Sequence, residues 1–381
     1  MIVFGASTNL FRGGTIAVRY AACRRQFANI KGSTQERKLL DYQTHMDILA
    51  SNISNGLVIQ MTARELVEKI VKESNKQIME DEFKLLDVLH HFTSGLKALA
   101  AEMSYLGVDE MRQACGGAGF LTASGIASLW EDVAPYSTYE GVNVIMYQQS
   151  ARYLLKQAAK VAKGKQCTGY FEYLNEMPNI MNLKSTASTV DEFLSWDHLV
   201  KTMATRSLVL VAQTSKLLTE STESSKAKTN ELFAMEVQKM VKTHLCYILF
   251  IMTKHRIETY PFVDANVRIP LDILVKIFAV KQILKDPQSL YECGYFGRGS
   301  GQLADAAYKK LLVDMRPHMV PFVEYSSNYT YGIVSTVGNS HGDIYETQLE
   351  VAKNSRLNKR EVPPFYEKYM KPTMTMRKPK L

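Results

Sequence analysis

The sequence predicts an all-α protein, and two observations carry this expectation. Apolar residues recur at intervals of three, four and seven positions through most long segments, which is the period of a helix that buries one face. No stretch of useful length alternates between apolar and polar residues, as a half-buried strand does. With 381 residues, of which 46% are hydrophobic, the chain is long enough for two or three domains and a large core.

The first predicted helix is IAVRYAACRRQF, residues 16–27. It is expected to carry Arg19, Arg24 and Arg25, and the default interpretation of these arginines is a solvated basic face. The alternative for Arg24 is that its planar fork of donors holds a phosphate group.

The next helices follow from periodicity and capping signals. One is expected to begin at Ser33, which forms a capping-box pattern with Glu36. The segment 82–107 has the same period, with Gly107 as its C-cap. Another amphipathic helix is expected at 144–163. The helix after Ser33 places these residues near one face: Leu39, Met46, Ile53, Leu57 and Gln60.

A break follows at 163–189, where Gly, Pro, Asn and Ser interrupt any helical period. Thr189 and Glu192 then show capping-box spacing at the start of a helix that is expected to run past Leu217. The remaining helices are predicted at 229–256, 271–286, 301–317 and 343–353.

These assignments divide the chain into two all-α units. The predicted domains are 1–165 and 190–381, joined by a linker at 166–189. In the second domain, Pro270 is expected at or just before the first turn of a helix, where its missing N–H does no harm.

Charge, cysteine usage and hydropathy exclude several classes of protein. Lys plus Arg number 46 and Asp plus Glu number 38, which gives a scattered net charge of +8. This excess suits anionic ligands, but no basic stripe of the kind that binds nucleic acid occurs. The five cysteines contain no CxxC and the eight histidines no HExxH, so we predict reduced thiols and no metal site. The longest apolar run, CYILFIM, is too short to span a membrane.

The stretch APYSTYEGVNVIMYQQSARYLL contains a single acid, Glu140, followed by Gly141. One interpretation is a capping box with Ser137 as N-cap. The other is chemical. Glycine in a first helical turn costs about 1 kcal/mol, and it makes sense if a flat group must approach the backbone beside the carboxylate. Apolar neighbours would leave that carboxylate poorly hydrated and therefore a stronger base.

A glycine-rich segment, RQACGGAGFLTASG, occupies residues 112–125. The spacing Gly116-Gly117-x-Gly119 differs from the dinucleotide-binding fingerprint, and no strand is predicted before it. A helix C-cap followed by a turn explains these glycines. The alternative is that the backbone N–H groups approach a ligand phosphate.

The order of five motifs resembles the C-terminal half of the acyl-CoA oxidases, flavoenzymes of peroxisomal β-oxidation. The motifs are TIAVRYAACRRQF, LLDYQT, TSGLKA, ACGGAGF and YEGVNVIMYQQSARYLLK. In addition, GDIYETQLEVAKNSRLNKREV at 342–362 resembles the family's extreme C-terminus. The resemblance implies an acyl-CoA dehydrogenase-like C-terminal helical bundle followed by a second helical domain, and the second domain favours an oxidase over a dehydrogenase.

The resemblance also implies a reaction. Glu140 would be the base that removes the α-proton of a fatty acyl-CoA, while bound FAD accepts the β-hydride and trans-2-enoyl-CoA forms. O2 would then reoxidise the flavin and yield H2O2. Hydrogen bonds to the thioester carbonyl, one of them from the base's own N–H, would stabilise enolate charge. Gly141 would leave room for the flavin ring.

Further FAD contacts are implied by position. Arg24 would contact the pyrophosphate, usually across a homodimer interface, and Asn143 would be a polar contact beside the flavin. Contacts to the adenosine and pyrophosphate part of the neighbour's flavin would come from Gln43, Gln113, Gly116 and Gly117. The resemblance also favours a peroxisomal location, with the terminal Pro-Lys-Leu as a degenerate form of the Ser-Lys-Leu address; taken alone, that tail is better explained as a solvated basic segment.

The sequence departs from the family in three ways. Ala118 replaces the His of CGGHG, and Val142-Asn143-Val144 replaces Glu-Asn-Thr. The helical and β-domains of the family's first half, which cradle acyl-CoA and much of the flavin, have no counterpart. We therefore expect little oxidase activity from the isolated chain. The alternatives are a non-catalytic helical fragment that keeps the fold and the dimer surface, and, less favoured, an acyl-CoA dehydrogenase.

Overall fold

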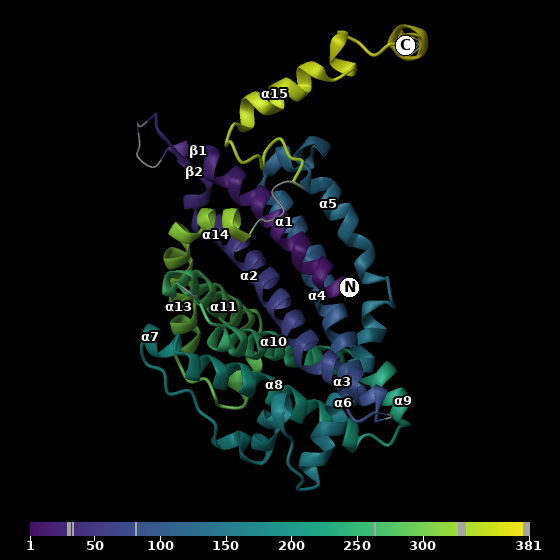
Figure 1. Ribbon diagram of the computed structural model, residues 1–381, viewed down its shortest axis with the longest axis vertical. Helices are drawn as coiled ribbons and strands as arrows, with labels where there is room; N and C mark the ends of the chain where they lie inside the picture. The colour runs from purple at the N-terminus through teal and green to yellow at the C-terminus, as the bar shows by residue number, and fades with distance from the viewer. Residues whose placement is uncertain (29–31, 33, 81, 263, 327–332, 376–381) are drawn as a thin grey trace, which may run out of the picture.

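The computed structural model describes residues 1–28, 32, 34–80, 82–262, 264–326 and 333–375, and helices dominate these residues (Figure 1). The predicted all-α class is confirmed. Long helices pack along one another in a first bundle, and its members are α1 (Ile2–Cys23), α2 (Gln43–Leu66), α4 (Leu86–Ala114) and α6 (Asn143–Ala162).

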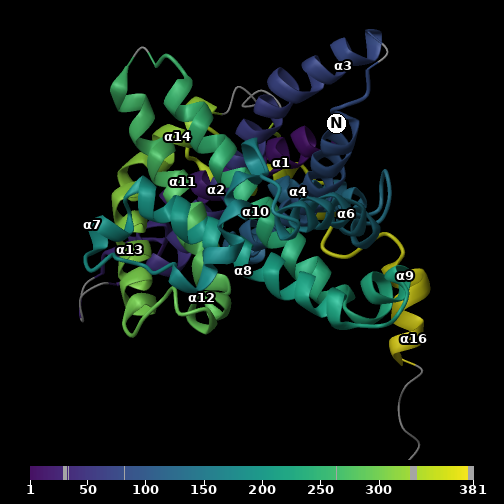
Figure 2. The same cartoon turned by 90° about the horizontal axis from the view of Figure 1, so that it is seen from below.

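A second group of long helices packs against the first. Its members are α8 (Trp196–Glu220), α10 (Ala234–Thr259), α11 (Ala265–Lys285) and α13 (Ser300–Met315). Viewed from below, α10 lies between α4 and α8, and it contacts both (Figure 2). Because α10 and α11 also pack on α2, the buried side chains of the two groups form one continuous hydrophobic cluster. The boundaries of the two proposed domains stay a prediction.

Shorter elements connect and flank the bundles. The strands are β1 (Arg25–Ala28) and β2 (Glu36–Lys38), and the short α-helices are α3 (Lys72–Met79), α5 (Ile126–Val133), α7 (Val190–Phe193), α9 (Ser225–Ala227), α12 (Gln288–Glu292), α14 (Met319–Ser326), α15 (Ile344–Asn354) and α16 (Lys371–Thr375). The π-helical segments are η2 (Val67–Val71), η7 (Lys228–Leu232) and η11 (Tyr366–Met370). The 3₁₀ segments are η1 (Leu39–Asp41), η3 (Gly116–Phe120), η4 (Thr122–Ser124), η5 (Ala134–Ser137), η6 (Gly169–Asn182), η8 (Arg316–His318) and η10 (Leu357–Lys359).

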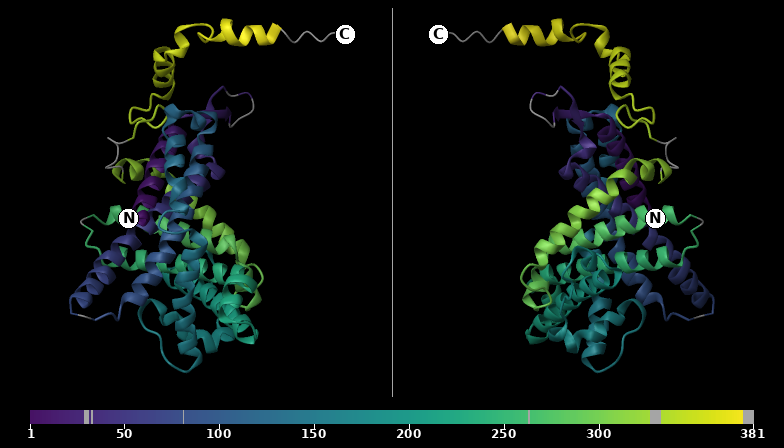
Figure 3. Two further views of the ribbon diagram at one scale, coloured as in Figure 1. Left: turned by 90° about the vertical axis from the view of Figure 1, so that its right-hand side faces the viewer. Right: turned by 90° about the vertical axis from the view of Figure 1, so that its left-hand side faces the viewer.

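α15 and α16 project away from the bundles (Figure 3). Among the described residues, no helix combines the length and apolarity needed to cross a bilayer.

The described residues include one small antiparallel pair of strands, too short and too exposed to show the alternation that was sought in the sequence. β1 and β2 pair, with Arg25 opposite Lys38 and Gln26 opposite Arg37. Apolar alternation is absent because neither strand buries a face in the core. Glu36 therefore lies in a strand, not in a first helical turn, and Ser33 lies outside the described residues.

The three arginines expected on one basic helical face have three different environments. Arg19 is on α1 but is only 5% exposed, and its guanidinium binds both carboxylate oxygens of Glu324 at 2.7 Å and the Gly338 carbonyl at 2.9 Å. Arg24 is the residue after the last turn of α1, and Arg25 begins β1. The solvated-face interpretation fails for Arg19 because the partner comes from α14, about 300 residues along the chain, where local sequence gives no signal.

Gly107 does not end a helix, because α4 continues to Ala114. It lies where α4 passes α1 and α2. A Cβ at this position would come within 2.5 Å of Asn52 Oδ1 and 2.7 Å of Leu10 Cδ2. The glycine is therefore required by close approach between helices and not by a turn.

Two other predicted helices differ in extent from those observed. The Thr189–Glu192 capping box is confirmed, with Glu192 N–H donating to Thr189 Oγ1 at 3.2 Å, but its helix ends at Phe193. Ser195 then caps α8. Pro270 lies inside α11 and not at its start, since the helix begins at Ala265.

A chain of buried polar groups crosses the seam between the bundles. His91 and His244 are fully buried, with 3.2 Å between their Nε2 atoms. His91 Nδ1 lies 2.8 Å from the Ser150 carbonyl oxygen, and His244 Nδ1 lies 2.8 Å from the Tyr173 hydroxyl. Because the two Nε2 atoms face each other in a hydrogen bond, only one of them can carry a proton. Burial lowers the pKa of His91 to about 4 and holds the pKa of His244 well below its ordinary value.

We expect acid to destabilise the fold through these histidines. The unfolded chain binds protons as the pH falls below 6.5, whereas folded His91 stays neutral until about pH 4. The free energy of unfolding should be highest above pH 6.5 and decrease between pH 6.5 and 4, by roughly 3 kcal/mol for His91 alone. Urea unfolding at several pH values measures this slope. The double variant His91→Gln, His244→Gln should flatten it and exposed His90→Gln should not; equal slopes in all three proteins would contradict the assignment.

The crossing at Gly107 gives a second prediction. Gly107→Ala should lower the free energy of unfolding by about 1–3 kcal/mol, since Asn52 is held by the Ile48 carbonyl and by Glu110 and cannot swing away freely. Chemical denaturation of the purified protein checks this. Gly297→Ala is the matched control, because its Cβ would meet nothing within 4 Å. Equal stability of the two variants would refute the steric explanation.

Candidate functional site

Glu140 stands in a tight turn between η5 and α6. Its φ is 57°, in the left-handed region, and Gly141 follows with φ 110°. Residues other than glycine adopt such a φ rarely, and they concentrate at functional sites. α6 begins at Asn143 with Val142 as N-cap and no side-chain cap. The alternative of a capping box between Ser137 and Glu140 is therefore wrong.

Lys97 fixes this turn from the middle of α4. Its side chain is 4% exposed, and Nζ donates to the Gly141 carbonyl at 2.7 Å and to Asn143 Oδ1 at 3.0 Å. Burial lowers the pKa of Lys97, and the nearby Glu140 carboxylate opposes that shift. A Cβ on Gly141 would lie 2.7 Å from Met146 Cε, the end of a flexible side chain, so the φ of 110° is the stronger reason for glycine at this position.

Sequence reasoning quoted Lys97 within TSGLKA but gave it no role. The types of residue that surround Lys97 on the helix could have indicated that its side chain is buried. Three of the four residues that lie three or four positions from Lys97 on α4 are small and buried, as expected where a long side chain lies over an apolar face. These neighbours are Ser94, Ala100 and Ala101.

The segment that precedes the Glu140 turn contacts the start of α1. Asn9 Nδ2 donates to the Tyr136 hydroxyl at 3.2 Å, and that hydroxyl lies 2.8 Å from the position a Cβ on Gly5 would take. The segment before Glu140 is thus attached to α1, while Lys97 attaches the segment after it to α4.

The expected poor hydration of Glu140 is wrong for this chain, because the side chain is exposed. The apolar neighbours that were expected to shield it also point outward. They form an exposed apolar surface around the carboxylate, made by Tyr139, Val142, Val144 and Ile145. Water could be excluded from Glu140 only by something that covers this surface.

Arg24 lies at the opposite end of α1. Its Nη1 donates to the Tyr345 hydroxyl at 2.9 Å, and this hydrogen bond raises the pKa of the guanidinium. The Arg24 carbonyl accepts the Leu39 N–H at 2.9 Å, which brings the start of α2, where Gln43 is exposed, next to Arg24. Tyr345, from α15, is a partner that the sequence did not suggest.

The glycine-rich segment lies toward the same end. α1 and α4 run in the same direction, because Gly107 faces Leu10 and Met111 faces Gly14. Exposed Gln113 donates to Asp109 at 2.8 Å in the last turn of α4. After it come Gly116 and Gly117, where an added Cβ would meet nothing within 4 Å.

The residues singled out from the sequence therefore form two groups. Near the start of α1 lie Glu140, Gly141 and Asn143, joined by Lys97. Near its end lie Arg24, Gln43, Gln113, Gly116 and Gly117. α1 has 22 residues, which at about 1.5 Å per residue separates the two groups by roughly 33 Å. Within the described residues, no group of three or more His, Cys, Asp or Glu side chains could hold a metal ion.

Comparisons with known proteins match this architecture. Residues 1–155 match the family model of the acyl-CoA oxidase C-alpha1 domain, and residues 195–375 match the acyl-CoA oxidase model. Peroxisomal acyl-coenzyme A oxidase 1 of Rattus norvegicus is 29% identical over 97% of this chain, and that of Arabidopsis thaliana is 27% identical over 98%. The chain spans about half the length of these relatives, 56% and 55% respectively.

Solved structures agree with the sequence comparisons. Acyl-CoA oxidase 1 of Arabidopsis thaliana superposes with a TM-score of 0.92 and 26% identity, covering 98% of this chain and 56% of its own. Acyl-CoA oxidase-1 of Caenorhabditis elegans, solved in complex with FAD and ATP, superposes with a TM-score of 0.89 and 26% identity, covering 99% and 56%. The two family models and the shared fold together show that this chain belongs to the acyl-CoA oxidase family.

Proposed function

We propose that this chain supplies the base-bearing helical half of an FAD-dependent acyl-CoA oxidase that acts on fatty acyl-CoA. The observation that carries the proposal is the Glu140 turn. A single carboxylate is held in a left-handed conformation at the surface, with Lys97 fixing the backbone directly after it. Maintaining an unfavourable backbone conformation by a buried lysine is expected where the position of the carboxylate matters.

The chemistry of the chain's own residues is proton removal and positioning. Glu140 would take the α-proton of the thioester, because it is an exposed carboxylate beside the exposed apolar surface. The N–H of Glu140 would donate to the thioester carbonyl as negative charge develops there. Lys97 holds the Gly141 carbonyl and Asn143, so it acts as a positioning residue for this turn.

The described residues fit a flavin. Gly116 and Gly117 leave open space above their backbone, Arg24 and Gln113 offer side-chain donors near them, and the apolar surface around Glu140 suits a flat aromatic ring. FAD, when bound, would accept the β-hydride and pass the electrons to O2 to give H2O2. The separation of the two groups along α1 supports a homodimer in which each group serves a different flavin.

The exposure of Glu140 supports the expectation that the isolated chain is nearly inactive. A hydrated carboxylate is a weak base toward a carbon acid, and water must be excluded before the proton is transferred. The second candidate function is therefore a non-catalytic helical module that keeps the family's flavin-facing surface. The relatives named peroxisomal suggest a peroxisomal location and a role in fatty acid β-oxidation; the Pro-Lys-Leu tail lies outside the described residues.

Activity distinguishes these functions. The purified chain, supplied with FAD and a medium-chain acyl-CoA, should produce little H2O2. Co-expressed with the part of the rat relative that this chain does not span, it should produce H2O2, and Glu140→Gln should reduce the rate by about 10²–10⁴. Exposed Glu131→Gln is the matched control.

Three outcomes would change the proposal. Strong turnover by the chain alone that is lost in Glu140→Gln would overturn the low-activity expectation and support the base. Full activity of Glu140→Gln in the co-expressed protein would show that another group removes the proton. If co-expression yields neither H2O2 nor visible flavin absorbance, the non-catalytic module becomes the better description.

Lys97 gives a prediction on stability. Lys97→Met should lower the free energy of unfolding by about 1–3 kcal/mol, because it leaves the Gly141 carbonyl and Asn143 Oδ1 without their shared donor. Urea unfolding measures this change. Exposed Lys156→Met, which removes only a surface pair with Asp87, should change stability little, and a similar loss in both variants would argue against a special role for Lys97.

A further inference from the structure

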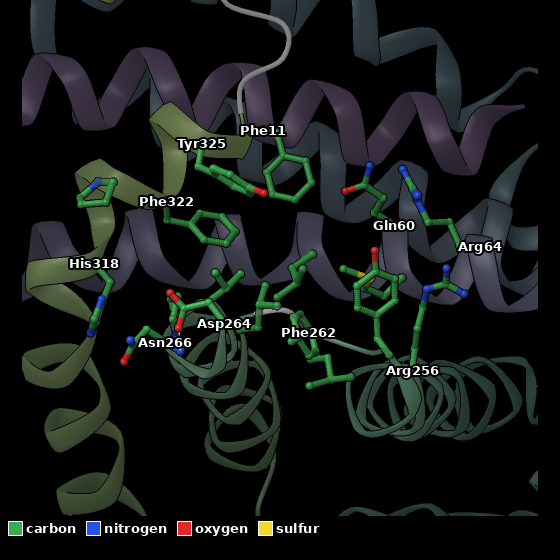
Figure 4. Close-up of a pocket in the computed structure, with 18 of the residues that line it drawn as sticks. Phe11, Gln60, Arg64, Arg256, Phe262, Asp264, Asn266, His318, Phe322 and Tyr325 are labelled. Carbon is green, nitrogen blue, oxygen red and sulfur yellow. Dashed lines mark hydrogen bonds between the residues drawn. The ribbon is translucent and has the colours of Figure 1, made fainter.

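A cavity of about 790 Å³ opens at the seam between the two groups of helices (Figure 4). Its walls come from α1, α2 and α14 on one side and from the adjoining ends of α10 and α11 on the other. This volume is in the range of small-molecule sites. Neither Lys97 nor any residue of the Glu140 turn lines it, so it is a different place from the candidate site.

Most of the cavity wall is apolar or aromatic. Phe11 and Phe322 face the cavity from α1 and α14 (Figure 4), and their rings lie 6.3 Å apart. Leu57 and Met61 of α2 and Phe262 extend this surface. A wall of this kind favours a hydrocarbon chain over a polar ligand.

The apolar surface continues to the outside. At the mouth, Tyr325 is 80% exposed, and Tyr260 and Val267 are exposed as well. Exposed aromatic side chains that surround an apolar cavity are unusual on a surface with no binding role. A ligand chain entering the cavity would cover them.

Polar groups concentrate at one end of the cavity. Gln60, Arg64 and Arg256 lie together there (Figure 4). Arg256 is already paired, since it donates to both carboxylate oxygens of Glu68 at 2.8 and 3.1 Å. The guanidinium of Arg64 is exposed, and it makes no hydrogen bond or ion pair with the residues that the structure describes.

Cations outnumber carboxylates at this end of the cavity. Lys69 binds Glu65 at 2.6 Å and Arg256 binds Glu68, which accounts for two cations and two carboxylates. Arg64 and Lys72 are further cations near Glu68, and of these two Arg64 lines the cavity. The opposite end of the cavity carries Asp264, so a negatively charged head group is favoured at Arg64 and disfavoured at Asp264.

We propose that this cavity binds a long-chain carboxylate, with the carboxylate at Arg64 and Gln60 and the hydrocarbon chain along Met61, Phe11 and Phe322. The guanidinium and amide donors match an anionic oxygen pair, and the aromatic walls match the chain. Because its walls come from both groups of helices, an occupied cavity would join α2 to α10, α11 and α14.

Calorimetric titration of the purified chain with dodecanoate tests this proposal. Saturable binding with one site per chain is expected, with much weaker binding of acetate, which lacks the chain, and of dodecyltrimethylammonium, which has the opposite charge. Arg64→Gln should weaken dodecanoate binding about tenfold or more. Arg152→Gln, an exposed arginine on α6, is the matched control and should bind normally.

A second variant tests the cavity by changing the size of a wall residue without changing its charge. Val267→Trp adds bulk to an exposed wall residue and should block dodecanoate, while circular dichroism verifies that each variant is folded. The proposal is wrong if dodecanoate does not bind, if Arg64→Gln and Val267→Trp bind it as well as the wild type, or if the cationic amphiphile binds equally. It is also wrong if Glu140→Gln, instead of Arg64→Gln, weakens binding.

Discussion

The close approach of α1, α2 and α4 is the constraint on which the rest of the structure depends. Gly56 and Gly107 permit it, since a Cβ at Gly56 would lie 3.2 Å from Leu10 Cβ and one at Gly107 would lie 2.5 Å from Asn52 Oδ1. With three backbones this close, α1 cannot slide or rotate without overlap. Both ends of α1 are therefore fixed, and each end carries one group of candidate site residues.

The two ends of α1 are stabilised by different chemistry. At its start, the Glu140 turn is held by a neutral hydrogen bond from Asn9 and a charged one from Lys97. Toward its end, the buried Arg19 guanidinium pairs with Glu324 and connects α1 to α14. A bidentate pair with a buried guanidinium orients an element strongly, because separating the two groups would leave the buried Arg19 charge without its partner. α14 is thereby held against α1, and the two groups of candidate site residues lie near the two ends of α1.

The same helix, α1, contacts the segment before the Glu140 turn at its start and α14, which lines the cavity, toward its end. α14 is held on α1 by Arg19, and the same helix supplies Phe322 and Tyr325 to the cavity. The Glu140 turn is open to solvent, while the cavity is largely formed by the chain itself. The two proposed roles thus differ in what they require: as a base, Glu140 would need to be covered by something outside the described residues, whereas the cavity would need only its ligand.

The sequence by itself determined what depends on neighbouring residues: the helical periods, the capping box at Thr189 and Glu192, and the motif order that indicated the family. The tertiary structure alone decided which residues meet across the chain. Arg19 was expected in solvent and is buried against Glu324, Gly107 was expected at a helix end and lies at a crossing, and Lys97 had no assigned role until it was found to hold the turn after Glu140. The hydration of Glu140 was also mispredicted, because apolar neighbours in sequence do not shield a carboxylate when all of them point outward. The physical reason is the sequence separation over which each interaction acts. Helical periodicity and capping depend on residues a few positions apart, whereas burial and ion pairing depend on distant segments that packing brings together.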